Sequence, residues 1–191
     1  MLKFISSRRS ISTFYELFPR TFPSGKPQWK VEPLKLRKEY RDLQAQHHPD
    51  MLSATTQSAQ VGGDQSSLLN KAYHTLKDPL LRSQHILKTV HGMDLNQEQV
   101  AQSLMQRNPN LLMQVLDIHE QLEEVQNEQD VHTIEQENKK RMKDIEFELA
   151  KCYEGGNFEK ASNLTVELKY WVSLAKAIKE WEPGQQVTLK H

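Results

Sequence analysis

The sequence predicts an all-α protein, with an N-terminal helical hairpin followed by a C-terminal three-helix bundle. Apolar residues after residue 30 recur at spacings of three and four, which is the pattern of one helical face. Two pairs, Asp78-Pro79 and Asn108-Pro109, combine a capping side chain with a proline at the first helical position. No segment shows the strict apolar and polar alternation that indicates a half-buried strand.

The hairpin is predicted from residue 33 onward. Its first helix begins at Pro33 and ends before Pro49, because proline lacks an amide donor and restricts the residue before it. The apolar face of this helix is Leu36, Tyr40, Leu43 and His47. The stretch SATTQSAQVGGDQSS, residues 53–67, has the composition of a loop. A second, antiparallel helix is expected to carry the apolar residues Leu69, Ala72, Tyr73 and Leu76.

Five further helices are expected after the hairpin. Pro79 begins a short one, and another short one follows Asn96. Asn108-Pro109 opens the C-terminal region, where long periodic segments cover 109–126, 130–154 and 157–181. Gly155-Gly156 ends the second of these, Asn157 caps the third, and Pro183-Gly184 ends it.

Composition excludes several classes of protein and site. No apolar run approaches the roughly 18 residues that a membrane-spanning helix needs, and the formal net charge of zero argues against general attraction to nucleic acid or anionic lipid. The single Cys152 excludes an intramolecular disulfide and a CxxC metal site. Its apolar helical phase predicts a buried structural thiol.

Charge is unevenly distributed along the chain. Residues 1–50 contain ten Lys or Arg and five Asp or Glu, whereas residues 108–138 contain eight Asp or Glu and no Lys or Arg. The two ends are therefore expected to meet different partners. The first fifteen residues include Lys3, Arg8 and Arg9 and no acidic residue. This composition predicts a mitochondrial transit peptide over residues 1–12, with a frayed basic terminus as the alternative.

The tripeptide His48-Pro49-Asp50 follows the basic helix. A catalytic role would need a nucleophile, and no Ser or Cys motif supplies one. A metal role would need three or four ligands, and adjacent residues do not face one another. A loop turn and a docking element remain, since proline and aspartate both favour turns. Four cations precede the tripeptide and would attract an acidic partner: Lys35, Arg37, Lys38 and Arg41.

The order of these segments resembles a J-domain. FYELF (14–18) is similar to the first short helix of that family, LRKEYRDLQAQHHPD (36–50) to the second helix with its tripeptide, and LNKAYHTLKDPLLRSQHIL (69–87) to the third helix and its continuation. A chance His-Pro-Asp in such a chain has a probability on the order of one percent. The resemblance implies that the tripeptide stimulates ATP hydrolysis by an Hsp70 chaperone. The Hsp70-binding residues would be His48, Pro49, Asp50, Lys35, Arg37, Lys38 and Arg41.

A second surface is predicted on the helix that begins at Pro109. Its buried stripe is Leu111, Val115, Ile118, Leu122 and Val125, all within about 40° of one direction. Leu112 and Leu116 lie outside this stripe, and Tyr170 in the last helix points away from Leu168. These three residues form either a partner surface or part of a wide core with one surface tyrosine.

The order of a J-domain and then a bundle containing LLMQVLDIHEQLEE and LTVELKYWVSLAKAI resembles the HscB/Hsc20 family over residues 13–182. The resemblance implies a J-domain over 13–92, a linker with a short helix over 93–108, and a scaffold-binding three-helix bundle over 109–182. It further implies a mitochondrial matrix cochaperone that binds the iron-sulfur cluster scaffold protein (Isu/IscU) and delivers it to mitochondrial Hsp70. The scaffold-contacting residues would be Leu111, Leu112, Leu116, Asp117, Glu120 and Tyr170.

The same resemblance implies a protein that is not an enzyme. No catalytic residue, metal ligand or cofactor is expected in this chain, because the scaffold's own ligands would hold the cluster and the ATPase site belongs to Hsp70. Gln114 occupies a position where a relative has a basic residue, which leaves a charge contact there in doubt. The alternative is a J-like tethering protein that does not activate Hsp70, and the intact tripeptide argues against it.

Overall fold

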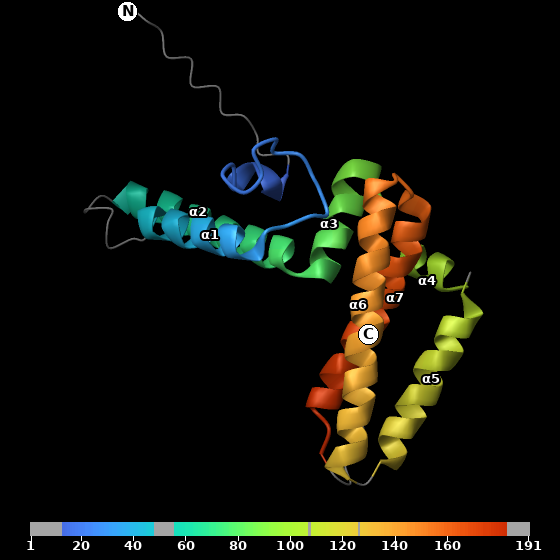
Figure 1. Ribbon diagram of the computed structural model, residues 1–191. Coiled ribbons are helices and arrows are strands. Elements are labelled where there is room, and N and C mark those ends of the chain that lie inside the picture. The colour runs from blue at the N-terminus through green and yellow to red at the C-terminus, as the bar shows by residue number, and fades with distance from the viewer. Residues whose placement is uncertain (1–12, 48–55, 107, 126, 183–191) are drawn as a thin grey trace, which may run out of the picture. The chain divides into compact units, whose positions relative to one another are not determined.

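The computed structural model describes residues 13–47, 56–106, 108–125 and 127–182. Within these residues it contains one 3-10 helix, seven α-helices and no strand, so the predicted all-α class is confirmed (Figure 1). The chain divides into two compact units between Leu81 and Arg82. The predicted transit peptide, the tripeptide 48–50 and Pro183-Gly184 lie outside the described residues, and the predicted domain limits stay predictions.

The first unit contains the short helix η1 (Phe14–Leu17), α1 (Pro33–His47) and α2 (Thr56–Lys77). α1 and α2 lie side by side (Figure 1). They are antiparallel, because Tyr40 Oη donates to Asn70 Oδ1 and Gln44 Nε2 donates to Ser66 O. α1 starts at Pro33 and runs to His47, as predicted; the side chain of His47 is not among those described. The buried core of this unit is Tyr15, Phe18, Phe22, Leu36, Leu69, Ala72, Leu76 and Leu80.

The predicted loop over residues 53–67 is wrong from Thr56 onward, because α2 already begins there. Gly62 and Gly63 each cost a helix about 1 kcal/mol relative to alanine. No proline interrupts residues 56–77, however, and the middle of the helix is held against α1 through Ser66, whose Oγ donates to Gln44 Oε1 at 2.8 Å. Tertiary contact thus outweighs the local glycine penalty.

A buried carboxylate joins the segment after η1 to α1. Glu39 is only 2% exposed. Its Oε1 accepts from the Arg20 amide at 2.8 Å, and its Oε2 accepts from the Thr21 amide at 2.7 Å and from Thr21 Oγ1 at 2.6 Å. These bonds satisfy two backbone donors that would otherwise be orphaned where the chain turns.

The second unit contains most of α3 (Pro79–His91), followed by α4 (Glu98–Gln106), α5 (Pro109–Glu124), α6 (Glu128–Glu154) and α7 (Phe158–Lys179). The three predicted helix caps are confirmed. Asp78 Oδ1 accepts from the Leu81 amide at 2.9 Å, Asn108 Oδ1 from Leu111 at 3.2 Å, and Asn157 Oδ1 from Lys160 at 3.0 Å. α6 ends at Glu154, immediately before Gly155.

α7 is the central helix of this unit and packs against α4, α5 and α6. Its buried surface is therefore wide, and it includes the polar residues Ser162 and Thr165. Thr165 belongs to a buried hydroxyl cluster in which Ser83 Oγ lies 2.5 Å from Thr165 Oγ1 and 2.6 Å from Tyr153 Oη. This cluster ties α3 to both α6 and α7.

None of the described helices combines the length and apolar character that crossing a membrane requires.

Candidate functional site

The basic residues of α1 form an exposed surface. Lys38 and Arg41 are three residues apart and point away from the buried Leu36, while Lys35 and Arg37 lie on its two flanks. All four are exposed, and no ion pair within the described part of the chain involves them. The cations are therefore free to meet an acidic partner. The tripeptide His48-Pro49-Asp50 that follows this helix lies outside the described residues.

The N-terminal cap sets the rotation of α5 in the second unit. Asn108 accepts from the Leu111 amide and Pro109 occupies the first turn, so the helix starts at a defined residue. Four residues then face the core, as predicted: Leu111, Val115, Ile118 and Leu122. Val125, predicted to continue this stripe, is half-buried just beyond the helix.

The outer face of α5 carries three adjacent exposed apolar side chains, which we call the α5 apolar patch. Leu112 is 46% exposed, Met113 63% and Leu116 51%. The wide core that would have absorbed Leu112 and Leu116 is therefore not present. Single exposed apolar residues are common on protein surfaces, whereas a contiguous group more often marks an interaction site.

Carboxylates border the α5 apolar patch on the side of the helix C-terminus. Asp117 and Glu120 are exposed, and neither has an ion-pair partner in the described residues. No Lys or Arg lies within four residues of either carboxylate along the helix. Gln114 is also exposed. An apolar centre with a polar, single-sign border is the usual anatomy of a protein interface.

Leu111 and Tyr170 lie in different surroundings from the other expected scaffold-contacting residues. Leu111 is 4% exposed and belongs to the core. Tyr170, predicted to point outward, is half-buried instead, which corrects that expectation. It packs against a cluster made by α3, α4 and α7 and the segment before α4: Leu87, Leu95, Leu104 and Val166.

The burial of Tyr170 follows from α4, which covers that side of α7. A signal for this packing was present in the sequence: Val100 and Leu104 are four residues apart and give α4 an apolar face that needs a partner. The structure thus brings Leu112, Leu116, Asp117 and Glu120 together on α5, and it places Tyr170 in the cluster beside α4.

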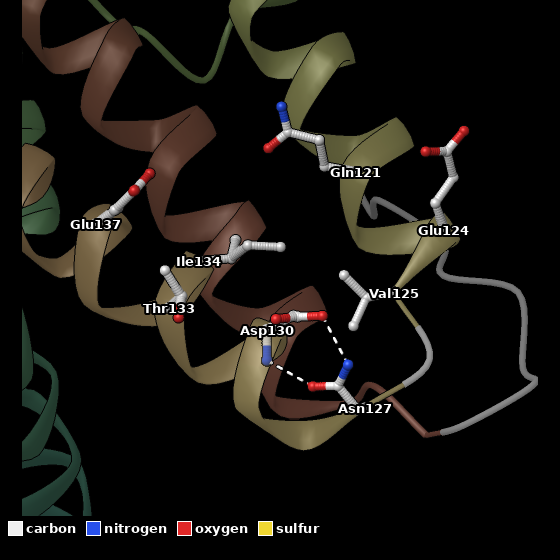
Figure 2. A pocket seen from close by; sticks show the side chains of 8 residues that line it. All are labelled: Gln121, Glu124, Val125, Asn127, Asp130, Thr133, Ile134 and Glu137. Atoms are coloured by element: carbon white, nitrogen blue, oxygen red, sulfur yellow. Dashed lines mark hydrogen bonds between the residues drawn. The ribbon is translucent and has the colours of Figure 1, made fainter.

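A cavity of about 560 Å³ lies between the end of α5 and the first turns of α6 (Figure 2). Sequence reasoning did not identify it. Its carboxylates include Asp130, which accepts from Asn127 Nδ2 at 2.6 Å, and Glu137, which pairs with Arg141 at 3.1 Å. Val125 and Ile134 add apolar surface to its lining. The described residues contain no group of three or more His, Cys, Asp or Glu placed to hold a metal ion.

Cys152 is buried in α6 and unpaired. Burial raises the pKa of its thiol, which disfavours the reactive thiolate form. The predicted structural role of this residue agrees with its location.

Comparison with known proteins identifies a matching family and several relatives of this chain. A family model described as the HSCB C-terminal oligomerisation domain matches residues 107–179. The chain is 52% identical to the "J-type co-chaperone JAC1, mitochondrial" of Saccharomyces cerevisiae, over 100% of both chains. It is 30% identical to the mouse "Iron-sulfur cluster co-chaperone protein HscB" over 152 residues, which are 79% of this chain and 63% of that protein.

Solved structures give the same relatives. Jac1 from Saccharomyces cerevisiae superposes with a TM-score of 0.81 at 49% identity, covering 91% of this chain and 99% of that one. The human co-chaperone protein HscB superposes with a TM-score of 0.70 at 25% identity, covering 85% and 80% respectively.

Proposed function

The chain belongs to the family of HscB and Jac1 J-type co-chaperones of iron-sulfur cluster biogenesis, and from this premise we propose that it binds the cluster scaffold protein and delivers it to mitochondrial Hsp70. Its location is the mitochondrial matrix. The co-chaperone has no reaction of its own in this proposal. Its partner Hsp70 hydrolyses ATP, and the cluster is cargo held by the ligands of the scaffold (Isu/IscU).

The α5 apolar patch is the observation that carries the scaffold-binding step. Leu112 and Leu116 are leucines about half exposed to water, and burying apolar surface against a partner is favourable in proportion to its area. Asp117 and Glu120 would pair with basic groups of the scaffold at the border. Tyr170, which is half-buried, would contribute through the exposed part of the residue.

The basic surface of α1 supports the Hsp70 step. Exposed cations without ion-pair partners in the described residues, Lys35, Arg37, Lys38 and Arg41, would steer an acidic surface of Hsp70 toward this helix. His48, Pro49 and Asp50 follow directly, and a proline-stiffened turn would present an imidazole and a carboxylate to the docked chaperone. The resulting ATP hydrolysis locks Hsp70 onto the scaffold and promotes cluster transfer.

Scaffold binding is tested with the double substitution Leu112→Ala and Leu116→Ala. Both side chains are exposed, so the core stays intact. Truncating an interface anchor commonly costs more than about 1 kcal/mol, so the pair should raise the dissociation constant for purified scaffold about thirtyfold or more. Tyr170→Ala is measured separately, because it also opens the α4 cluster.

The control for the double variant is Hsp70 stimulation, which should keep its normal rate because it uses the other unit. Unchanged scaffold affinity in a folded double variant would refute this binding surface. Loss of both activities, together with lower helicity, would indicate unfolding.

The Hsp70 step is tested with His48→Gln in an ATPase assay of purified mitochondrial Hsp70. The variant should fail to stimulate hydrolysis, while His132→Gln, at an exposed position on α6, should stimulate normally. A normal rate with His48→Gln would instead favour a tethering protein that does not activate Hsp70.

A further inference from the structure

The short helix α4 packs against both α5 and α7. Its Leu104 is 7% exposed and belongs to a buried cluster with Leu87, Leu95 and Val166. Tyr170 packs against the same cluster. We propose that α4 is a positioning element for scaffold binding, in which Leu104 holds the side chain of Tyr170 in the orientation that the scaffold contacts. This inference rests on the proposed function, because it concerns how one of the contact residues is held.

The inward face of α4 consists of Val100 and Leu104. These residues are four positions apart and therefore neighbours on the helix, and both belong to the packing around Tyr170. Gln102 and Gln106, which are exposed, lie on the opposite side. A helix of nine residues is marginal in isolation, so α4 depends on this one apolar face. The contact with the cluster is therefore what holds α4 in place.

The facing side of α7 carries Tyr170 about one turn after Val166. Val166 is 4% exposed, whereas Tyr170 is half-buried, so part of the tyrosine packs in the cluster and part of it remains accessible to a partner. A contact residue whose rotamer is already restricted by packing loses less conformational entropy when a partner binds. Packing against α4 can therefore raise the affinity for the scaffold without adding a contact to it.

The location of α4 suits this role. Only residues 107 and 108 separate its last residue, Gln106, from the first residue of α5, Pro109. One helix thus contacts both of the elements that carry the proposed scaffold-binding residues. Leu104 itself is too buried to touch a partner protein. An effect of Leu104 on affinity must therefore pass through a neighbouring side chain, and Tyr170 is the neighbour with an accessible part on α7.

The test is a double-mutant cycle between Leu104 and Tyr170, in which isothermal titration calorimetry measures the affinity of the full-length protein for purified scaffold. Leu104→Ala should raise the dissociation constant at least about fivefold, and Tyr170→Ala about tenfold or more. The double variant should stay within about twofold of Tyr170→Ala, because no tyrosine is left to position. Leu104→Met roughly keeps the side-chain volume and should stay within about twofold of the wild type.

Leu149→Ala is the matched control for lost stability. Leu149 is a buried leucine of the same unit, on α6, with 0% exposure, and it is not a member of the cluster around Tyr170. Its truncation should leave the affinity within about twofold of the wild type. If circular dichroism shows that Leu104→Ala is unfolded, Val100→Ala replaces it in the cycle. Val100 is only half-buried, and its truncation should raise the dissociation constant about threefold.

The outcomes separate this inference from the proposed function. Wild-type affinity in Leu104→Ala, together with lost affinity in Tyr170→Ala, overturns the positioning role alone. Additive losses in the double variant overturn it too, because Leu104 would then act through a different contact. An equal loss in Leu149→Ala would assign the effect to general loosening of the unit. Wild-type affinity in Tyr170→Ala overturns this inference, and wild-type affinity in the Leu112 and Leu116 double variant as well overturns the proposed binding surface.

Discussion

Leu111, Leu112 and Met113 are consecutive in the sequence and have unlike surroundings. One residue turns an α-helix by about 100°, so a buried position is followed by two exposed ones. The Asn108 cap determines which of the three faces the core, since it sets the residue at which α5 begins. At this scale, exposure follows from register and not from residue type.

Leu111→Ala should therefore lower the free energy of unfolding and should have little effect on the affinity for the scaffold. Removing a buried leucine commonly costs about 2–5 kcal/mol, whereas Leu112→Ala, at an exposed position, should cost less than about 1 kcal/mol. Urea unfolding followed by circular dichroism measures both values. Wild-type stability in Leu111→Ala, combined with lost scaffold binding, would indicate that Leu111 contacts the scaffold and is not a core residue.

The sequence was sufficient to predict the outward positions of Leu112 and Leu116, because their phase relative to the buried stripe is a local property. The burial of Tyr170 was not predictable in the same way, since it depends on where α4 packs. Glu39 shows the same limit: a glutamate in a basic helix reads as solvated, and only the fold brings the Arg20 and Thr21 amides to its carboxylate.

At the scale of elements, side-chain bonds between segments supplement apolar packing. The starts of α3, α5 and α7 were predicted accurately, because Asp78, Asn108 and Asn157 act on amides within one turn. The start of α2 was not predicted, because the bonds that hold α2 to α1 join residues far apart in the sequence. Glu39 and Glu148 are two further cases in which one carboxylate joins separate elements.

Glu39→Gln should destabilise the first unit by about 2 kcal/mol, because an amide group would turn a donor toward a backbone N–H and lose a charge-assisted bond. Asp42→Asn is the matched control. Asp42 pairs with the same Arg20, at 2.7 Å, but on the exposed surface, where an ion pair contributes less than about 1 kcal/mol. Equal unfolding midpoints for the two variants in urea would contradict the structural role of Glu39.

Glu148 on α6 contacts Lys151 on the same helix and Lys160 on α7, at 2.7 and 2.9 Å. Bonds from Lys151 and then Lys160 lower the pKa of Glu148 from 4.5 to about 2. The stabilisation is therefore complete above the unfolded value of 4.5 and is lost as pH falls toward about 2.

The melting temperatures of the wild type and Glu148→Gln should accordingly differ at pH 7 and converge as pH falls from 4.5 toward about 2. Thermal melts at several pH values measure this difference, and added salt should reduce it, because the groups are exposed. A difference that grows on acidification would contradict the assignment.

At the scale of the whole molecule, the formal net charge is zero, but two regions of the chain carry opposite charge. The excess of Lys and Arg lies in residues 1–50, and the acidic stretch of residues 108–138 includes α5. Because electrostatic steering depends on the local field near a surface, the two regions favour partners of opposite charge. One chain can thereby bind two proteins without a common site.

Reversing Asp117 and Glu120 to lysine should slow scaffold association about tenfold or more at low salt, and the difference should shrink at high salt. Stopped-flow measurements at several salt concentrations report the rate constant. Hsp70 stimulation by the same variant is the control and should not change. A salt-independent loss would point to lost contacts instead of lost steering.

The acidic end of α5 has a consequence for the helix itself. Glu120, Glu123 and Glu124 lie near a C-terminus that carries no basic residue in its last turn, although the partial negative charge of a helix C-terminus favours cations there. This end of α5 is consequently held less firmly than its capped start. A basic partner would neutralise the carboxylates and the helix dipole together, so amide hydrogen exchange in the last turn of α5 should slow when the partner binds, even at residues that the partner does not touch.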